Sequence, residues 1–408
     1  MRRIDGRAMT APFDPSQVTY LYFGTDWDAE NRTSAHHVAR WLGERSQVRY
    51  FECPGLRAPK TNGRDMRRLI RKVVGALRPA RHPSANVEVR TLLQLPFRRV
   101  PGVAAFNQWL LRLAVRRAAA SARRAGGAVV SWFAVPHVGA LAGAVGEDLV
   151  VQYCVDDYSA LPDVDASSVA AMDTALSQRA DIVFVTSHTL VARKALIARH
   201  VAVSPHGVNV EHFRRAADAS LPLPAEMAAL SGVVIGFFGL IEAWIDLDLV
   251  SALAARHPDW SFVMVGRVAV PAVPQLPNLH FIGRRPYDLL PDYGRRFDVS
   301  IIPYRATQQV HFANPIKLRE YLAMEKPIVS MPTPEIDRFA DVVSRATTVD
   351  EWDAALLAAV APGDRRTQQA AMRAVADSMT WDARLTRVQG IVADALSGRP
   401  FDPPPVDR

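Results

Sequence analysis

Residues 314–330 read NPIKLREYLAMEKPIVS, and this stretch predicts a helix that begins at an anion-binding position and ends before a short buried strand. Asn314 is a favourable N-cap, and Pro315 suits the first helical position, where a missing N–H costs nothing. A helix N-terminus offers free N–H donors and a positive dipole end, which suit a diphosphate. Lys317 would add charge in the first turn, and Glu320 would share its face and accept hydrogen bonds from ribose hydroxyls. An ordinary surface helix with an i,i+3 ion pair would show the same pattern.

The composition is that of a large globular chain. Its 408 residues are enough for two or three domains, and the hydrophobic fraction of 49% fits an extensive core. No run reaches the roughly 18 apolar residues of a membrane-spanning helix, and the first residues include charges but no apolar signal region. The two cysteines, Cys53 and Cys154, lack metal-binding spacing. We therefore expect a cytoplasmic protein whose thiols are reduced and buried.

Positive charge is concentrated in one part of the chain. Between Arg64 and Arg124 the sequence has fourteen arginines and one lysine against two acids, so this segment carries +13 while the whole chain carries +8. Such a field indicates an anionic partner, namely phospholipid, nucleic acid or a phosphate-bearing acceptor. Residues 64–81 and 106–124 are both basic and amphipathic, which is typical of interfacial helices. Core-packed helices with a solvated arginine face would give the same pattern.

Two series of alternating strands and helices predict two α/β domains. The first series opens with a strand at residues 18–23 that ends at Gly24, and the second with a strand at 233–238 that ends at Gly239. A strand, a loop and a helix in this order are how doubly wound domains begin. The predicted parts are a flexible tail at 1–16, a domain at 17–215, a linker at 216–231, a domain at 232–380, a helix at 381–397 that packs back toward the first domain, and a tail at 398–408.

Six motifs follow one another in the second half of the chain. They are HGVNVEHF at 206–213, GFFG at 236–239, VGR at 265–267, NLHFIGRRPYDLLPDY at 278–293, FDVSIIPYR at 297–305, and the stretch quoted above. In order and spacing this series resembles the GT-B glycosyltransferases, over about residues 18–397. The resemblance implies an α/β, GT-B fold, in which two Rossmann-like, doubly wound domains face each other across a cleft. The first would bind the acceptor and the second a nucleotide-sugar donor.

The resemblance also implies roles for residues on the donor side. The turn at Gly239 would bring backbone amides near the donor phosphates, because glycine permits a close approach. Lys317 matches a phosphate contact and Glu320 a ribose contact. A basic segment matches the loop that usually holds the nucleotide base. The alternative is that its arginines are ordinary loop residues exposed to solvent, with no role in binding. The full donor-side set is Gly239, Arg284, Arg285, Tyr287, Asn314, Lys317 and Glu320.

On the acceptor side, two aspartates follow the hydrophobic strand at residues 148–155. An aspartate at the carboxyl end of a strand can act as the base that takes a proton from the acceptor hydroxyl. Asp156 is the first choice for that base and Asp157 the second, and a structural role for both, such as helix capping, is the alternative. Further acceptor-side candidates are Asp26, Trp27, Arg32 and His206.

Three departures from the family pattern bear on stereochemistry. Many retaining members have a glutamate eight residues before the ribose glutamate, where this chain has Phe312. The glycine that is usual near the helix end is replaced by Glu325, and the His-Asp pair common in retaining members by Asp156 and Asp157. These changes favour an inverting enzyme that resembles the bacterial glucuronosyltransferase of xanthan assembly.

The sequence therefore predicts a hexosyl- or glucuronosyltransferase that acts on a lipid-linked or glycan acceptor in cell-surface polysaccharide or glycolipid assembly. We expect it to lie peripherally on the inner face of the cell membrane, attracted by anionic lipid. A nucleotide-sugar 2-epimerase of the same architecture is one alternative. A basic nucleic-acid-binding protein is another, but no recognised nucleic-acid module accompanies the charge, so we predict no nucleic-acid partner. We predict no cofactor beyond the nucleotide-sugar co-substrate and no required metal, because no Asp-x-Asp signature stands in a suitable loop.

Overall fold

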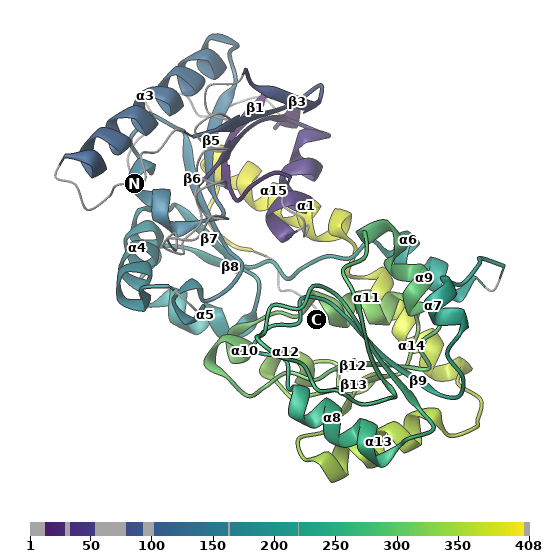
Figure 1. Cartoon of the computed structure of the whole chain (residues 1–408). Coiled ribbons are helices and arrows are strands. Elements are labelled where there is room, and N and C mark those ends of the chain that lie inside the picture. The colour runs from purple at the N-terminus through teal and green to yellow at the C-terminus, as the bar shows by residue number, and fades with distance from the viewer. Residues whose placement is uncertain are drawn as a thin grey trace. The chain divides into compact units, whose positions relative to one another are not determined.

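The computed structural model in Figure 1 describes residues 13–28, 33–53, 79–92, 102–161, 164–218 and 220–403. The chain forms two compact units. The first contains residues up to Pro205 together with the segment from Leu385 onward, and the second runs from His206 to Arg384. Most of the basic stretch at residues 64–81 lies outside the described residues, as does Arg32.

The first unit is built on an eight-stranded sheet with the order β3-β4-β2-β1-β5-β6-β7-β8. Every neighbouring pair is parallel except β3 and β4. The central strands are almost entirely buried, as expected for a parallel sheet covered on both faces. The strands are β1 (Val18–Gly24), β2 (Gln47–Glu52), β3 (Arg81–Ser84), β4 (Val87–Thr91), β5 (Ala128–Phe133), β6 (Leu149–Cys154), β7 (Ile182–Val185) and β8 (Val201–Val203).

Helices connect these strands. The α-helices are α1 (Ser34–Gly43), α3 (Val103–Arg124), α4 (Ala166–Arg179) and α5 (His188–Ala195), with short 3-10 helices η2 (Pro136–Leu141) and η3 (Tyr158–Ala160). The helix α3 packs against β1 and β5. From β1 the chain adds strands outward on one side of the sheet, and from β5 it adds strands outward on the other side. The unit is therefore doubly wound, as predicted.

The second unit repeats the plan with a six-stranded parallel sheet of order β11-β10-β9-β12-β13-β14. Its core has two parts: Val234 and Phe238 of β9 belong to one, and Ile235 and Phe237 to the other. One strand therefore feeds apolar side chains to both faces of the sheet. The strands are β9 (Val234–Phe238), β10 (Ser261–Val265), β11 (Leu279–Gly283), β12 (Val299–Ile302), β13 (Ile328–Ser330) and β14 (Ser344–Arg345).

The helices of the second unit begin before its first strand. They are α6 (Val210–Arg214), α7 (Ala225–Ala228), α8 (Leu247–Arg256), α9 (Leu290–Gly294), α10 (Gln308–Phe312), α11 (Ile316–Ala323), α12 (Pro334–Asp337), α13 (Val349–Val360) and α14 (Arg366–Asp377), while α15 (Trp381–Leu396) continues into the first unit. Together the two units have the α/β, doubly wound architecture that the sequence predicts.

The boundary between the units differs from the prediction. Residues 216–231 were expected to be a linker because they are rich in alanine and proline, yet they lie within the second unit. Ala216 and Met227 are buried in its core beside Phe213. The apolar residues of this segment therefore cover the second sheet, and the change of unit comes earlier, at Pro205.

The end of helix α11 contains an unusual backbone conformation. Glu325 follows the helix with φ +57°, the left-handed position that glycine usually occupies after a helix. Its buried carboxylate accepts two hydrogen bonds from Arg373, each 2.7 Å long, and Arg214 lies 3.7 Å away. This bidentate pair fastens the end of α11 to α14.

Both cysteines, Cys53 and Cys154, are free and buried, and both lie in the first unit. Burial raises the pKa of Cys154 to about 12. None of the helices in the described part of the chain combines the length and the hydropathy that crossing a bilayer requires.

Candidate functional site

Two glycine-containing turns meet at the carboxyl ends of β9 and β10. Gly239 donates its N–H to the carbonyl of Val265 at 2.9 Å and has φ +153°. A Cβ atom added at Gly266 would lie 1.6 Å from the carbonyl oxygen of Gly239, so no side chain fits there. The two motifs GFFG and VGR thus form one compact corner in which two backbone segments approach more closely than side chains would allow.

Lys317 lies directly beside this corner. A Cβ atom added at Gly239 would stand 3.2 Å from Cε of Lys317, and the ammonium group lies 4.9 Å from the centre of the Phe238 ring. Nζ of Lys317 donates to Oε2 of Glu320 at 2.8 Å. Lys317 and Glu320 therefore share a helix face, as predicted, and their ion pair is also the one expected of an ordinary surface helix. The Gly239 turn and the first turn of α11 lie side by side.

Glu320 is buried, with 4% of its side chain exposed, and Lys317 is its ion-pair partner. Burial raises the pKa of this carboxyl, and the attraction of Lys317 only partly opposes that effect. A buried acid beside a partly exposed cation is a polar pair held within an otherwise apolar core, next to Tyr321 and Phe238. Such an arrangement suits a ligand that offers both hydroxyl and phosphate groups.

The prediction that Asn314 is the N-cap of this helix is wrong. The cap position is Pro315, and the Asn314 side chain instead donates from Nδ2 to Oε2 of Glu335 at 2.7 Å. Both side chains are almost fully buried. The charge-assisted hydrogen bond from Nδ2 to the carboxylate of α12 fixes the orientation of this side chain, and its Oδ1, the atom that would cap a helix, accepts no hydrogen bond from a described residue. Asn314 therefore joins α12 to the start of α11.

Tyr287 reaches the same neighbourhood through a chain of aromatic rings. It stacks on His212 with centroids 4.8 Å apart and meets the edge of Phe213 at 5.6 Å. Phe213 in turn lies 5.9 Å from Phe238, the ring beneath Lys317. Burial lowers the pKa of His212, whose Nε2 lies 3.1 Å from the carbonyl oxygen of Tyr287. The loop after β11 is thus fixed relative to the Lys317 turn.

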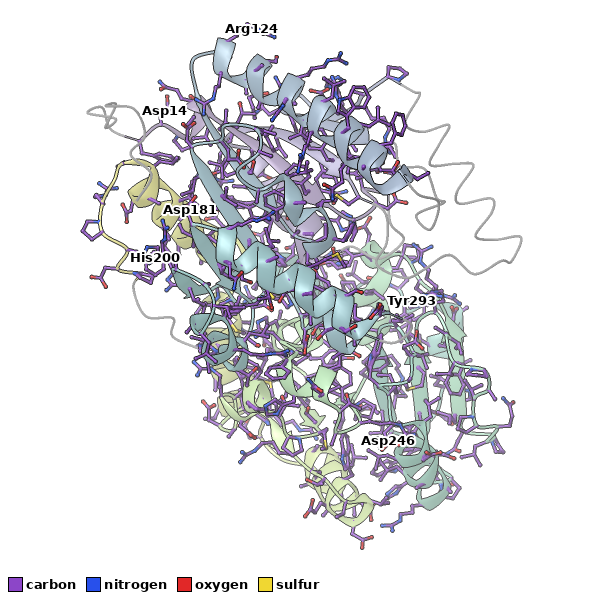
Figure 2. The ribbon with its side chains drawn as sticks, turned by 90° about the vertical axis from the view of Figure 1, so that its left-hand side faces the viewer. Asp14, Arg124, Asp181, His200, Asp246 and Tyr293 are labelled. Carbon is purple, nitrogen blue, oxygen red and sulfur yellow. The ribbon has the colours of Figure 1, made fainter. Side chains whose placement is uncertain are left out.

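The two arginines of this loop have different surroundings. Arg284 is exposed, whereas Arg285 donates from Nε to the hydroxyl of Tyr293 at 2.6 Å and from Nη2 to Glu226 at 2.9 Å. Tyr293 is labelled in Figure 2, and its hydroxyl also donates to Glu226 at 2.6 Å. These hydrogen bonds, first from Tyr293 and then from Arg285, lower the pKa of Glu226 to about 2. Arg285 therefore already has a structural partner in the fold.

The paired aspartates lie just past the carboxyl end of β6 in the first unit. Asp157 caps the 3-10 helix η3 by accepting from the N–H and hydroxyl of Ser159, and it accepts from Arg193 at 2.5 Å. Burial acts to raise the pKa of Asp157, but the hydrogen bonds from Ser159 and Arg193 outweigh it, so the pKa lies below its ordinary value. Asp156 is half-buried, and its Oδ1 accepts from the N–H of Asp157 at 2.8 Å.

The other acceptor-side candidates do not all lie in the same unit. Trp27 is buried against Tyr50 with centroids 4.9 Å apart, and Oδ1 of Asp26 accepts from the N–H of Asp28. Of the remaining two, Arg32 lies outside the described residues, and His206 is the first residue of the second unit, 6.3 Å from the Trp381 ring.

Glu52, which the sequence reasoning missed, gathers three neighbouring segments of the first unit. Its buried carboxylate accepts from the N–H of Trp27 at 3.0 Å, from the hydroxyl of Thr91 and from Arg81. Burial acts to raise its pKa, but the bonds from Thr91, Trp27 and Arg81 lower it overall. The only available signal was a charged residue at the end of a hydrophobic strand, which does not reveal its partners.

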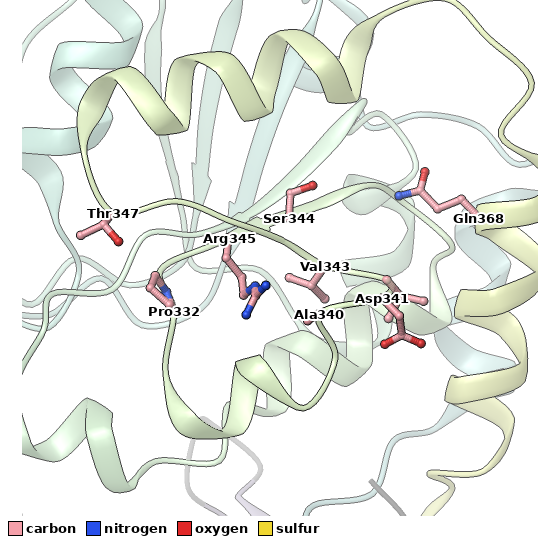
Figure 3. A pocket seen from close by; sticks show the side chains of 9 residues that line it. Pro332, Ala340, Asp341, Val343, Ser344, Arg345, Thr347 and Gln368 are labelled. Atoms are coloured by element: carbon pink, nitrogen blue, oxygen red, sulfur yellow. The ribbon is translucent and has the colours of Figure 1, made fainter.

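A cavity of about 410 Å³ lies elsewhere in the second unit, as Figure 3 shows. It is lined by residues of the segment 340–347 together with Pro332 and Gln368. Arg345 in its wall is already paired with Asp337 at 3.0 Å. None of the predicted site residues that the structure describes lines this cavity. We assign the candidate site to the Gly239–Lys317 region, where the charged pair lies beside the glycine turn.

Comparison with known proteins points to the same region. Residues 233–372 match the family model described as glycosyl transferases group 1, a range that contains Gly239, Lys317 and Glu320. The chain is 27% identical over 225 residues to a putative teichuronic acid biosynthesis glycosyltransferase, TuaH, of Bacillus subtilis strain 168. That match covers 51% of this chain and 56% of the relative, so it spans only about half of each.

Solved structures resemble the whole chain in fold. Sucrose-phosphate synthase from Thermosynechococcus elongatus has a TM-score of 0.66 at 13% identity and covers 94% of this chain and 100% of its own. Anabaena HepE, solved in complex with UDP and glucose, has a TM-score of 0.63 at 13% identity, with coverages of 93% and 99%. These structures confirm the predicted GT-B fold, and the family model at residues 233–372 confirms the resemblance to group 1 glycosyltransferases.

Proposed function

We propose that this chain is a glycosyltransferase that moves a sugar from a nucleotide-diphosphate sugar to an acceptor hydroxyl. The observation that carries the proposal is the Lys317–Glu320 pair beside the Gly239 turn. This pair lies within the range that matches the group 1 glycosyl transferases. Lys317 would contact the diphosphate, the first-turn amides of α11 would add donors, and Glu320 would accept from the ribose.

Transfer then requires one bond to form and one to break. The acceptor oxygen attacks the anomeric carbon, and the bond from that carbon to the diphosphate oxygen breaks with its electron pair on the leaving group. Lys317 and the helix N-terminus would stabilise the negative charge that develops on the diphosphate. The proton of the acceptor hydroxyl passes to a base.

We assign the base to Asp156 rather than Asp157, and an inverting outcome follows from that assignment. Asp157 already accepts from Arg193 and Ser159, and its lowered pKa makes it a poor proton acceptor. Oδ1 of Asp156 accepts the backbone N–H of Asp157 at 2.8 Å. The likeness to sucrose-phosphate synthase supports the fold alone and does not bear on this choice.

The acceptor is proposed to be a lipid-linked or free glycan of cell-surface polysaccharide assembly. The support is the partial likeness to a relative whose name refers to teichuronic acid biosynthesis. Asp26, an acceptor-side candidate just after β1, is exposed in the first unit.

A ligand screen tests the proposal. Thermal denaturation is followed in the presence of UDP, GDP, ADP and their common sugar conjugates, because a ligand that binds only the native state raises the midpoint. We expect one nucleoside diphosphate to raise the midpoint in the native chain and to have less effect on Lys317→Ala. The matched control is Lys326→Ala, whose ammonium donates to the carbonyl of Arg295 elsewhere in the unit.

The product analysis separates the competing reactions. With the best donor, NMR of the sugar distinguishes transfer or slow hydrolysis from epimer formation, and EDTA tests whether a metal is needed. A 2-epimer as the product without any acceptor would replace the proposal with an isomerase. No shift with any nucleotide diphosphate would remove the donor-site assignment.

A further inference from the structure

The helix α3 has two faces of opposite character. Its buried stripe is formed by Asn107, Leu111, Val115, Ala118 and Ala122, whose spacing follows the helical repeat and which face the rest of the first unit. The opposite stripe is defined here as the α3 outer face. It consists of Phe106, Trp109, Leu113, Arg117, Ala120 and Arg124.

The start of the α3 outer face presents two large aromatic rings to solvent. Phe106 is 46% exposed and Trp109 is 58% exposed, and their rings stack with centroids 5.9 Å apart. The other large apolar side chains exposed in the described residues, Leu196 among them, lie singly on different elements. Two adjacent exposed aromatic residues on one helix face indicate a partner surface rather than scattered exposure.

The remainder of the α3 outer face is basic. The helix contains five arginines and no acid, and Figure 2 labels Arg124 at its end. Arg116 and Arg123 donate to carbonyl groups of the first unit, at Ala144 and Gly146. Arg117 and Arg124 are exposed and make no hydrogen bond or ion pair with another described residue. Their charge therefore remains available to an external anion.

We propose that the α3 outer face docks on an anionic lipid membrane. Aromatic rings favour the boundary between headgroups and acyl chains, and arginines beside them pair with lipid phosphates. This inference rests on the proposed function, in that a lipid-linked acceptor would lie in the membrane that α3 contacts. A nucleic acid could bind the arginines through its phosphates. The two exposed aromatic rings, which stack on each other, favour a lipid membrane, because its interfacial region accepts apolar rings beside phosphate groups.

Vesicle flotation tests the proposal with the full chain. Vesicles of phosphatidylcholine with and without phosphatidylglycerol are compared at low and high salt. We expect recovery with the anionic vesicles, falling as salt screens the arginines. Changing both Phe106→Ser and Trp109→Ser should lower the lipid-bound to free ratio by about tenfold or more, since the insertion of two rings is lost.

Matched variants separate this face from general effects. Leu196→Ser removes another exposed apolar side chain of the first unit and should leave binding unchanged. Arg117→Glu with Arg124→Glu should lower binding, whereas Arg117→Lys with Arg124→Lys should retain most of it, because the charge is kept. Arg366→Glu, on an exposed arginine of the second unit, controls for net charge.

Three outcomes overturn the proposal. They are equal recovery with neutral vesicles, unchanged binding in the double serine variant, and displacement of anionic vesicles by duplex RNA at equal phosphate concentration. Nucleotide binding is measured on the same variants by thermal shift. If the serine variant fails to float but binds nucleotide like the native chain, the docking face is supported. If native chain floats but binds no nucleotide, the docking face stands and the proposed function fails.

Discussion

Two carboxylates of this chain, Asp157 in the first unit and Glu320 in the second, have surroundings that shift their pKa values in opposite directions. At the strand end of the first unit, Asp157 is surrounded by donors, and its pKa is lowered. At α11 of the second unit, Glu320 is buried beside Lys317, and its pKa is raised. The first carboxylate accepts hydrogen bonds from two other side chains, while the second accepts one from Lys317. A buried acid with a raised pKa, beside a cation and a glycine turn, is the better candidate for ligand contact.

The largest effect is expected at Asp156, the neighbour of Asp157. Asp156→Asn should retain nucleotide binding but lower turnover by about 10² or more, the usual contribution of a positioned base. Asp157→Asn should lower turnover less and stability more. Steady-state transfer rates and nucleotide thermal shifts on both variants measure this. Full activity in Asp156→Asn with an inactive, folded Asp157→Asn would reverse the two roles.

The next effect is expected on the donor side. Lys317→Ala should weaken binding of the nucleoside diphosphate by about 1–3 kcal/mol, because the phosphate loses a charged donor. Glu320→Gln should weaken it less, since the amide oxygen still accepts a hydrogen bond. Isothermal titration with the nucleotide found in the screen provides the values. Equal affinities for the native chain and Lys317→Ala would contradict the assignment of the nucleotide site to the Lys317–Glu320 pair.

The comparison also predicts opposite pH dependences of stability. Because the folded-state pKa of Asp157 is lowered, its contribution is present above about pH 4 and is lost as the pH falls through the folded-state pKa. Because the pKa of Glu320 is raised, its protonated form favours folding at low pH, and that advantage is lost as the pH rises through the folded-state pKa.

Urea midpoints between pH 3 and pH 8 test these signs. Asp157→Asn should cost about 1–3 kcal/mol at pH 7, and the cost should fall as the pH drops below about 4. Glu320→Gln should become more stable relative to the native chain as the pH rises. Parallel curves for the native chain and both variants would show that the surroundings of the two acids are not as different as their contacts indicate.

The smallest effect is expected at the other end of α11. Glu325→Gly should be more stable than Glu325→Ala by about 1 kcal/mol, because only glycine adopts φ +57° without strain, while both lose the pair with Arg373. Chemical denaturation of the two variants gives the difference directly. An alanine variant as stable as the glycine variant would mean that the backbone relaxes once the ion pair is gone.

Much of the fold could be predicted because parallel strands are nearly continuous hydrophobic runs. The segments VVIGFF and DLVVQYCV predict β9 and β6, and Gly239 follows the first of them at the expected end. The contact between Lys317 and Glu320 was also predictable, since it lies within one helical turn.

What could not be predicted depends on residues far apart in the chain. Asn314 has the composition of a cap, but Glu335, 21 residues later, takes its side chain. Glu52 joins three segments that only the sheet order brings together. The segment 216–231 has the composition of a linker, and composition does not reveal that Met227 fills a place in the second core.

The position of the two cysteines gives this chain a built-in reporter of local opening. A thiol reacts as its thiolate, so the buried Cys154, with its pKa of about 12, is protected until the surrounding structure opens. The second unit contains no cysteine at all. The rate at which a thiol reagent labels the native protein therefore measures the opening of the first unit alone. Comparing that rate with the fluorescence of the whole chain would show whether the two units unfold as one cooperative body or as two.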